Sequence, residues 1–109
     1  MRLTEKKCVP CEGGVPPLTQ EQIQPYLAEV TGWAVSEDGR KIKKEFRFKD
    51  FREAMAFVNR VAELAESEGH HPDISIAYNR VVLELSTHAV GGLTENDFIL
   101  AAKINQLGG

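Results

Sequence analysis

The spacing of apolar residues changes twice along this chain, and this change restricts the folds available to it. In residues 41–48, and again in residues 73–86, apolar and polar side chains alternate with a period of two, which is typical of half-buried strands. In residues 51–65 the apolar side chains recur every three or four positions, as on one face of a helix. A short chain with both patterns must pack helices against a sheet.

The segment after the N-terminal arm predicts a first helix. Thr19 and Gln22 have the spacing of a capping box. Apolar residues then recur at helical spacing as far as Gly32, which we expect to end the helix. Pro25 removes one backbone donor inside this segment, so the helix is either kinked or begins later than Thr19 suggests.

Two strands follow and are expected to pair as a hairpin. They span residues 33–35 and 41–48, with Glu37-Asp38-Gly39 as turn residues between them. In the longer strand the apolar residues share one face, and Lys44 is the one exception on that face.

The second helix has the clearest periodicity in the chain. Asp50 and Glu53 form a start signal, Gly69 suits the left-handed residue that ends a helix, and Pro72 prevents its continuation. Its predicted apolar stripe consists of Phe51, Ala54, Met55, Val58, Val61, Ala62 and Ala65.

A second hairpin and a third helix complete the predicted fold. With Asn79-Arg80 as the turn, Ile76 pairs with Leu83, and the same register places His71 level with His88. Thr94 begins the third helix. Short connections favour antiparallel pairs, so we predict an α+β fold, a four-stranded antiparallel sheet with helices packed on one face, in the order α-β-β-α-β-β-α.

The 109 residues suit a single domain, with residues 1–17 as an irregular arm and residues 18–109 as the folded part. In the arm, Cys8 and Cys11 lack a second ligand pair at zinc-finger spacing, which favours two simple thiols over a metal or redox site. A net charge of -3 with scattered basic residues argues against direct nucleic-acid binding. Without an apolar run of membrane-spanning length or a signal-peptide core, we expect no membrane contact and a cytoplasmic location.

All three histidines lie between Glu66 and Asp97. His70 and His71 are adjacent after the second helix, and His88 ends the last strand. Imidazoles that titrate near neutral pH, with carboxylates nearby to orient them, suit general acid–base chemistry. The pair Gly91-Gly92, which follows His88, would allow a ligand to approach the backbone closely.

Each of these residues also has a structural explanation. A histidine at a helix C-terminus interacts favourably with the helix dipole, Asp97 completes a capping box with Thr94, and Glu66 suits a solvated helix face. The glycine pair could simply form a loop. Three histidines and a carboxylate can bind zinc, but no His-x-x-x-His or other chelating spacing occurs. Because all three histidines fall near one end of a predicted strand pair, a functional site is favoured over these structural explanations, and the missing chelating spacing favours a site without metal.

Several of these residues together resemble a known family. The pattern Glu66-x-x-x-His70-His71-Pro72, followed by Tyr78, His88 and Asp97, resembles the signature of the pterin-4a-carbinolamine dehydratases at every anchor and spacing. The segments 79–81, 85–88 and 92–94 are also similar to that family. The resemblance covers about Leu18 to Leu107.

The resemblance implies a lyase that dehydrates 4a-hydroxytetrahydropterin to quinonoid dihydropterin, which is recycled to tetrahydrobiopterin for an aromatic amino-acid hydroxylase. It implies an α+β sandwich that needs no metal or bound cofactor and assembles as a homodimer or homotetramer. Animal members also act as dimerisation cofactors of a homeodomain transcription factor. A non-catalytic protein-binding module, or an enzyme acting on another pterin such as a molybdenum-cofactor intermediate, remain the alternatives.

On this reading His70 is the principal acid–base group, His88 its partner, and His71 a residue that holds the pterin. Glu66 and Asp97 orient histidines or bind ring nitrogens. The resemblance adds Pro72 and Thr87 to the substrate-binding positions.

An oligomer is also expected from the apolar residues off the predicted stripes. In a chain this small they exceed what one core can cover. They include Phe57, Leu64, Ile99 and Leu100.

Overall fold

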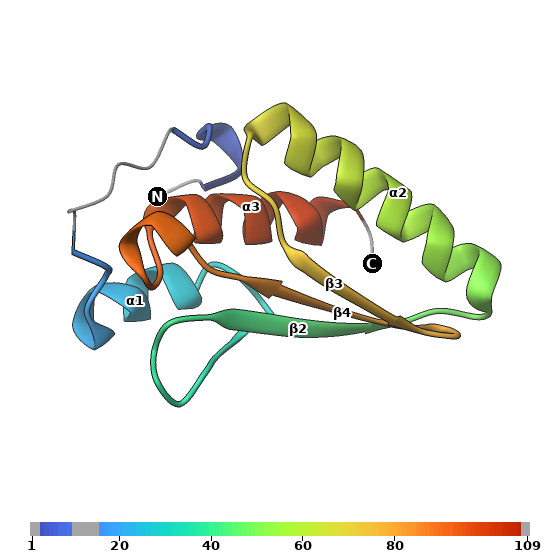
Figure 1. Ribbon diagram of the computed structural model, residues 1–109, viewed down its shortest axis with the longest axis horizontal. Helices are drawn as coiled ribbons and strands as arrows, with labels where there is room; N and C mark the ends of the chain where they lie inside the picture. Colours follow the sequence, from blue (N-terminus) through green and yellow to red (C-terminus); the bar gives the residue numbers. More distant parts are fainter. Residues whose placement is uncertain (1–2, 10–15, 108–109) are drawn as a thin grey trace.

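The computed structural model describes residues 3–9 and 16–107, which form a four-stranded antiparallel sheet with helices on one face (Figure 1). This arrangement confirms the predicted fold class. In chain order the elements are η1 (Leu3–Glu5), α1 (Gln20–Leu27), β1 (Ala34–Val35), β2 (Ile42–Arg47), α2 (Phe51–Glu68), β3 (Asp73–Ala77), β4 (Arg80–Leu85), η2 (His88–Val90) and α3 (Glu95–Gln106).

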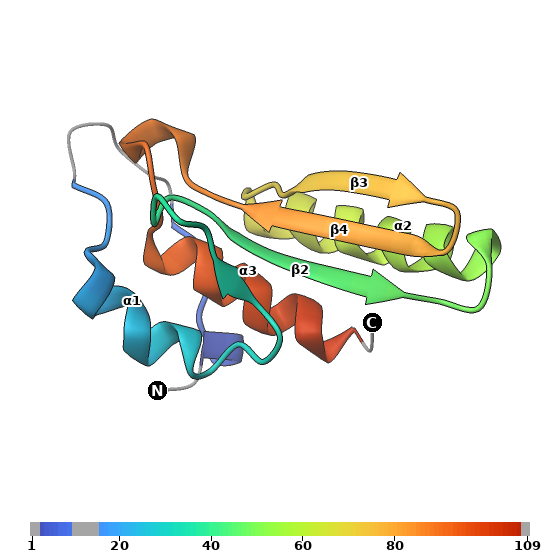
Figure 2. The same cartoon turned by 90° about the horizontal axis from the view of Figure 1, so that it is seen from below.

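The sheet has the order β1-β2-β4-β3, so β2 and β4 lie at its centre. Figures 1 and 2 show α2 and α3 on the same side of the sheet. On that side the apolar side chains of the central strands β2 and β4 are buried, while Lys43, Glu45 and Arg47 of β2 face solvent. The buried side chains of the two central strands are Ile42, Phe46, Val81, Leu83 and Leu85.

Lys44 lies on the inward face of β2 and is accommodated by contacts at its end. Its ammonium donates to the Thr31 carbonyl oxygen at 3.0 Å and to Asn105 Oδ1 at 2.9 Å, and it lies 4.9 Å from the ring centroid of Phe46. Partial burial lowers the pKa of Lys44. The apolar face of β2 tolerates a lysine at this position because the lysine stem covers apolar surface while its ammonium is hydrogen-bonded.

The sequence signals for helix ends were accurate for α1 and α2 at three of four positions. Thr19 caps α1 through the predicted capping box, and Asp50 caps α2 by accepting from the Glu53 backbone N–H at 3.0 Å. Gly69, at φ +66°, ends α2 in the left-handed region. However, α1 contains Pro25 and ends at Leu27, well before Gly32.

The buried face of α2 differs from the predicted stripe. Phe57 is completely buried and its ring lies 4.8 Å from that of Phe46, whereas Phe51 and Ala62 are exposed. The helix carries apolar residues on more than one side, so periodicity left its orientation open. Contact of Phe57 with Phe46 of β2 and with Phe48 just after the strand determines which side is buried.

Helix α3 lies at the centre of the molecule, where it contacts α1, α2 and η1. Ile99 and Leu100 are therefore buried within the single chain, as is Phe57, while Leu64 is partly buried. These residues do not need a second subunit to cover them. The expectation that they lie at an oligomer interface was wrong, because packing within one chain already buries these helix faces.

The turn of the second hairpin is Tyr78-Asn79, not Asn79-Arg80. Ile76 pairs with Val81 and Ala77 with Arg80, two residues away from the predicted register. Tyr78 has φ +54°, a left-handed conformation that sequence rules assign to glycine or asparagine. A shift of two residues keeps every side chain on its predicted face, so the buried side of β4 was still correctly identified.

Residues 3–9 of the N-terminal arm pack against the folded part of the chain. Leu3–Glu5 form one turn of 3-10 helix with Leu3 buried. The chain then runs alongside α3 as far as Val9, which is hydrogen-bonded to Asn96. Cys11 lies outside the described residues. Among the described helices, none has the length and apolar character required to cross a membrane.

We predict that Phe57→Ala lowers the free energy of unfolding by about 3–5 kcal/mol, because it leaves a cavity against the sheet. Phe51→Ala is the matched control, since Phe51 is on the same helix but 49% exposed, and we expect it to cost less than about 1 kcal/mol. Urea denaturation followed by circular dichroism measures both. Equal losses in the two variants would contradict this assignment of the buried face.

Candidate active site

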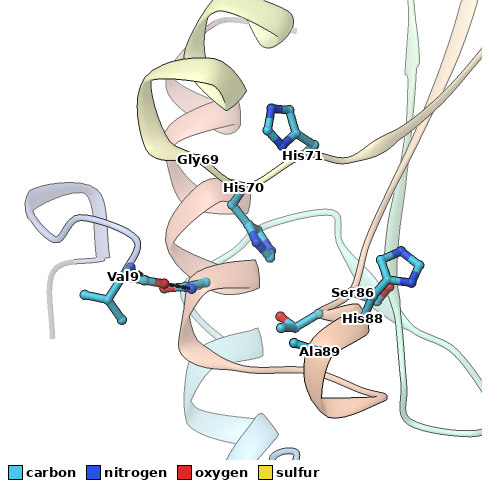
Figure 3. Close-up of a pocket in the computed structure, with 9 residues that line it drawn as sticks. Val9, Gly69, His70, His71, Ser86, His88 and Ala89 are labelled. Carbon is cyan, nitrogen blue, oxygen red and sulfur yellow. Dashed lines mark hydrogen bonds between the residues drawn. The ribbon is translucent and has the colours of Figure 1, made fainter. Parts of the chain in front are cut away.

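A pocket of about 260 Å³ brings the three histidines together at one end of the sheet. Figure 3 shows His70 and His71 on the segment that follows α2, with His88, Ser86 and Ala89 across the pocket and Val9 of the arm beside it. The full lining is Val9, Gly69, His70, His71, Ser86, Thr87, His88, Ala89 and Asn96. Residues that are far apart in sequence therefore share one hollow.

His70 is held by a buried carboxylate. Its Nε2 lies 2.6 Å from Asp97 Oδ1, the side chain of His70 is 11% exposed, and that of Asp97 is fully buried. A hydrogen bond to a charged group is stronger than a neutral one, and burial shields it from water. The orientation of the His70 imidazole is therefore determined by the interior of the protein.

Asp97 has this position because it also caps α3. Its second oxygen, Oδ2, accepts from the Thr94 backbone N–H at 2.9 Å and from the Thr87 hydroxyl at 2.8 Å. The hydroxyls of Thr87 and Thr94 lie 2.9 Å apart. These contacts compensate the carboxylate for lost hydration, which an isolated buried charge could not tolerate.

The contact with Asp97 assigns the proton positions on His70. A carboxylate only accepts hydrogen bonds, so Nε2 of His70 carries a proton and its N–H donates a hydrogen bond to Asp97. In the neutral ring the lone pair is then on Nδ1. His70 can take up a proton at Nδ1 and release it again, which is the property required of an acid–base group.

His71 has a different environment from its neighbour. Its Nε2 pairs with Glu66 Oε2 of the last turns of α2, and both side chains project into solvent. The two side chains are 58% and 77% exposed, so water screens the interaction and its contribution to stability is small. Adjacent histidines thus have unequal surroundings, as expected for neighbours on an extended segment.

His88 lies in η2 and not at the end of a strand, because β4 ends at Leu85. Its side chain is exposed on the wall opposite His70 (Figure 3). The predicted alignment of His71 with His88 was wrong, since β3 begins only at Asp73 and neither His70 nor His71 belongs to a strand. The 3-10 turn η2 places His88 at the pocket, and strand pairing has no part in this placement.

The other expected site residues occupy varied positions. Glu66, Pro72 and Asp97 are outside the pocket lining within the described part of the chain, and Asp97 is connected to it through His70 and Thr87. Thr87 lines the pocket, but its hydroxyl is bonded to Asp97 and Thr94. The close approach at Gly92 comes from the chain itself, because a Cβ atom there would lie 2.7 Å from Cβ of Pro17.

Five lining residues were not identified as site residues from the sequence: Val9, Gly69, Ser86, Ala89 and Asn96. Val9 contacts Asn96 across 87 positions in the sequence. No local pattern could have shown this contact. The one signal in the sequence for Asn96 as a lining residue was its position beside Asp97, because both residues lie in the first turn of the same helix.

Across residues 3–9 and 16–107, no three side chains of His, Cys, Asp or Glu come together in a way that could hold a metal ion. What the pocket does offer is several imidazoles and one buried carboxylate behind them. This arrangement can bind a polar heterocycle and move protons on it.

The fold and this pocket define a small α+β protein with a histidine–carboxylate site. The chain belongs to the pterin 4 alpha carbinolamine dehydratase family, whose sequence model matches residues 16–107.

Relatives of known sequence and structure agree with this assignment. A protein of Halorhodospira halophila, named "Putative pterin-4-alpha-carbinolamine dehydratase", is 49% identical over 108 residues, which cover 99% of each chain. A relative of the same name from Nitrosospira multiformis is 51% identical over 96% of this chain and 91% of its own.

Two solved structures have a similar fold. The crystal structure of a transcriptional coactivator/pterin dehydratase from Brucella melitensis has a TM-score of 0.80 and 38% identity, covering 85% of this chain and 99% of its own. A pterin dehydratase-like protein described as a RuBisCO assembly factor in the alpha-carboxysome has a TM-score of 0.63 over 74% of this chain and 94% of its own; at 24% identity it shows a common fold alone.

We predict that Thr87→Val lowers the free energy of unfolding by about 1–3 kcal/mol, because it removes a buried hydrogen bond to Asp97 without changing side-chain shape. Ser86→Ala, in the same segment, is the control and should cost less than about 1 kcal/mol. Urea denaturation measures both variants. An unchanged stability of Thr87→Val would show that Asp97 does not depend on this hydroxyl.

Proposed function

We propose that this protein dehydrates 4a-hydroxytetrahydropterin to quinonoid dihydropterin by histidine acid–base catalysis. The observation that carries the proposal is the placement of His70, which is held by the buried Asp97 in a pocket that His71 and His88 also line. Membership of the pterin dehydratase family supports the substrate class.

The reaction requires two proton movements. The bond between C4a and its hydroxyl oxygen breaks as an acid protonates the oxygen, and water leaves. A base takes the proton of a ring nitrogen, whose N–H electron pair completes the new ring double bond. No electrons are gained or lost, so the step needs no redox partner. Each positioned acid or base contributes on the order of 10²–10⁴-fold to the rate.

His70 is suited to the main proton transfer because Asp97 holds its orientation and leaves Nδ1 available. His88 lies on the opposite wall and is suited to act on a second position of the same ligand. His71, exposed and paired with Glu66, is assigned to binding. Glu66 orients His71 and Asp97 orients His70, whereas Pro72 and Thr87 shape the backbone around the ligand.

The wider role follows from the product. Quinonoid dihydropterin is a compound that a reductase can return to the tetrahydropterin, so the enzyme is linked to an aromatic amino-acid hydroxylase that makes its substrate. We assign this recycling to the cytoplasm. The alternatives are a different pterin substrate and a protein-binding role without catalysis. A negative result in the assay below would favour these alternatives.

The proposal is tested by stopped-flow measurement of the dehydration of synthetic 4a-hydroxytetrahydropterin. We predict that His70→Ala and His88→Ala each lower kcat on the order of 10²–10⁴-fold, because a transition-state proton transfer is lost. His71→Ala should raise KM more than it lowers kcat. The double variant at His70 and His88 should lose less than the product of the two single losses.

Wild-type protein that does not accelerate the reaction would overturn the proposal. An inactive His71→Ala at saturating pterin, together with an active His70→Ala, would reverse the assigned roles. Circular dichroism of each variant checks that folding is unchanged. Elemental analysis of active protein is expected to find no stoichiometric metal.

We also propose that the protein is a homodimer or homotetramer, now on different evidence. The edge strand β3 leaves Ile74 and Ile76 about 37% and 38% exposed, on the same face as the buried residues of β4. An apolar edge strand is a ready site for pairing with another chain.

Light scattering at micromolar concentration should therefore give two or four times the mass of one chain. Ile76→Lys should shift the population to monomer, because it places a charge in the contact, whereas Lys43→Ala on the outward face of β2 should not. A monomeric wild-type protein would contradict the proposal.

A further inference from the structure

A second cavity, of about 170 Å³, adjoins the histidine pocket at the same end of the sheet. It is lined by Arg40 and Lys41 from the end of the turn between β1 and β2, and by residues 86–88 and 91–92 around η2. Residues 86–88 line both cavities. In Figure 3 the His88 imidazole lies on the side of the histidine pocket away from His70. A ligand held by the histidines is therefore next to this second cavity.

Strand pairing brings the two sides of the second cavity together. Ile42, the first residue of β2, pairs with Leu85, the last residue of β4, and the two strands are antiparallel. The residues just before β2 therefore lie beside those just after β4. Figures 1 and 2 show the green turn that precedes β2 at the same end of the molecule as η2. Arg40 and Lys41 thus lie beside the segment that carries His88.

Hydrogen bonds within the turn position the backbone of both basic residues. The Arg40 N–H donates to Asp38 Oδ1 at 3.0 Å, and the Lys41 N–H donates to the Ser36 hydroxyl at 3.1 Å. The Ser36 N–H in turn donates to the Lys41 carbonyl oxygen at 2.8 Å. The two cationic side chains consequently project from a turn of defined shape, which reduces the entropy lost when they bind a ligand.

The charge of the second cavity is positive. Arg40 and Lys41 are cationic at neutral pH, and among the described residues that line the cavity none is Asp or Glu. The Lys41 ammonium lies 3.9 Å from Glu84 Oε2, but both side chains are partly exposed, so water weakens this pair. Glu84 lines a different hollow, beside β1. Asp38 is also outside the lining, although its charge interacts with those of Arg40 and Lys41.

The sizes of the two cavities suit one ligand that extends over both. A typical small-molecule site encloses about 300–1,000 Å³. The histidine pocket, at about 260 Å³, and the second cavity, at about 170 Å³, are each smaller than this range. A pterin carries its side chain at one corner of the ring, so the ring and the end of the side chain can occupy neighbouring cavities. The second cavity therefore suits a small anionic group attached to a ring.

We propose that Arg40 and Lys41 form a subsite for a phosphate ester on the side chain of the pterin, so that the preferred ligand is a phosphorylated pterin. This inference rests on the proposed function for the pterin ring. A phosphate monoester carries a charge of about −1.5 to −2 at neutral pH, which two neighbouring cations match better than the single charge of a carboxylate. The Arg40 guanidinium can bind two phosphate oxygens at once, and the Lys41 ammonium adds a second positive charge.

The phosphate lies away from the atoms that react, so its contacts are the same in the bound substrate and in the transition state. Their loss raises KM for a phosphorylated substrate and leaves kcat unchanged. Because both side chains are exposed, dissolved salt screens their charges. The affinity for a phosphorylated pterin should therefore fall as ionic strength rises, whereas the affinity for an unphosphorylated pterin should not.

The first experiment uses calorimetry to compare two ligands that differ only in the phosphate, 7,8-dihydroneopterin and its 3′-monophosphate. At low salt the wild-type protein should bind the monophosphate on the order of tenfold more tightly, as expected for charge-assisted hydrogen bonds at a partly exposed site. In about 1 M NaCl, where charges are screened beyond about 3 Å, most of this preference should disappear.

The second experiment assigns the preference to the two side chains. A double variant with Arg40→Ala and Lys41→Ala should bind the two ligands with affinities equal within about twofold. Arg40→Lys keeps the charge but loses the forked contact, so it should retain part of the preference. Arg47→Ala is the matched control, because it removes the same charge from an exposed residue at the other end of β2, outside both cavities. The control should keep the full preference, and circular dichroism checks the folding of each variant.

Equal affinity of the wild-type protein for the two ligands would overturn the inference, and so would a preference that survives in the double variant. Inorganic phosphate that binds as tightly as the monophosphate would also overturn it, because the pterin ring would then add nothing. Dehydration of unphosphorylated 4a-hydroxytetrahydropterin by the wild type would leave the proposed function intact in each of these cases. The expected phosphate preference without any dehydratase activity would overturn the proposed function and support the subsite. A protein that binds neither ligand and has no dehydratase activity would overturn both.

Discussion

The buried carboxylate of Asp97 connects the fold of this protein to its site. One oxygen binds the His70 imidazole, and the other caps α3 and accepts from the Thr87 hydroxyl. A fully buried carboxylate has no hydration, so its hydrogen bonds to protein groups must replace it. The loss of any one of these bonds would leave a buried charge without a partner, which costs more free energy than the loss of a hydrogen bond at the surface. Thr87, Thr94 and His70 therefore have to meet at this point, and the end of β4, the start of α3 and the end of α2 are brought together.

The central position of α3 makes this arrangement possible. The helix contacts α1, α2 and η1, so its first turn lies in the interior while neighbouring backbone still leads to the pocket. Asn96 and Asp97 are consecutive residues of that turn. One holds the arm through Val9 and the other holds His70, so both walls of the pocket are positioned by the same rigid element.

Most signals that act over a few residues were reliable in the sequence, and the helix end expected at Gly32 was the exception. The caps at Thr19 and Asp50, the helix end at Gly69 and the alternation in β2 and β4 correspond to the structure, because each depends on backbone hydrogen bonds within one turn or one strand. Signals that depend on a partner were not. Phe57 was assigned to the wrong side of α2, and the hairpin turn was displaced because Tyr78 adopts a conformation that its residue type disfavours.

The sequence by itself determined the order of helices and strands, the buried side of the sheet, and the group of histidines and carboxylates that make up the candidate site. It also carried the family resemblance. Only the tertiary structure decided that Asp97 pairs with His70, that His71 is paired with Glu66 in solvent, and that Val9 reaches the pocket. These contacts join residues between 5 and 87 positions apart, and their formation depends on how whole helices pack, which no local pattern of residues records.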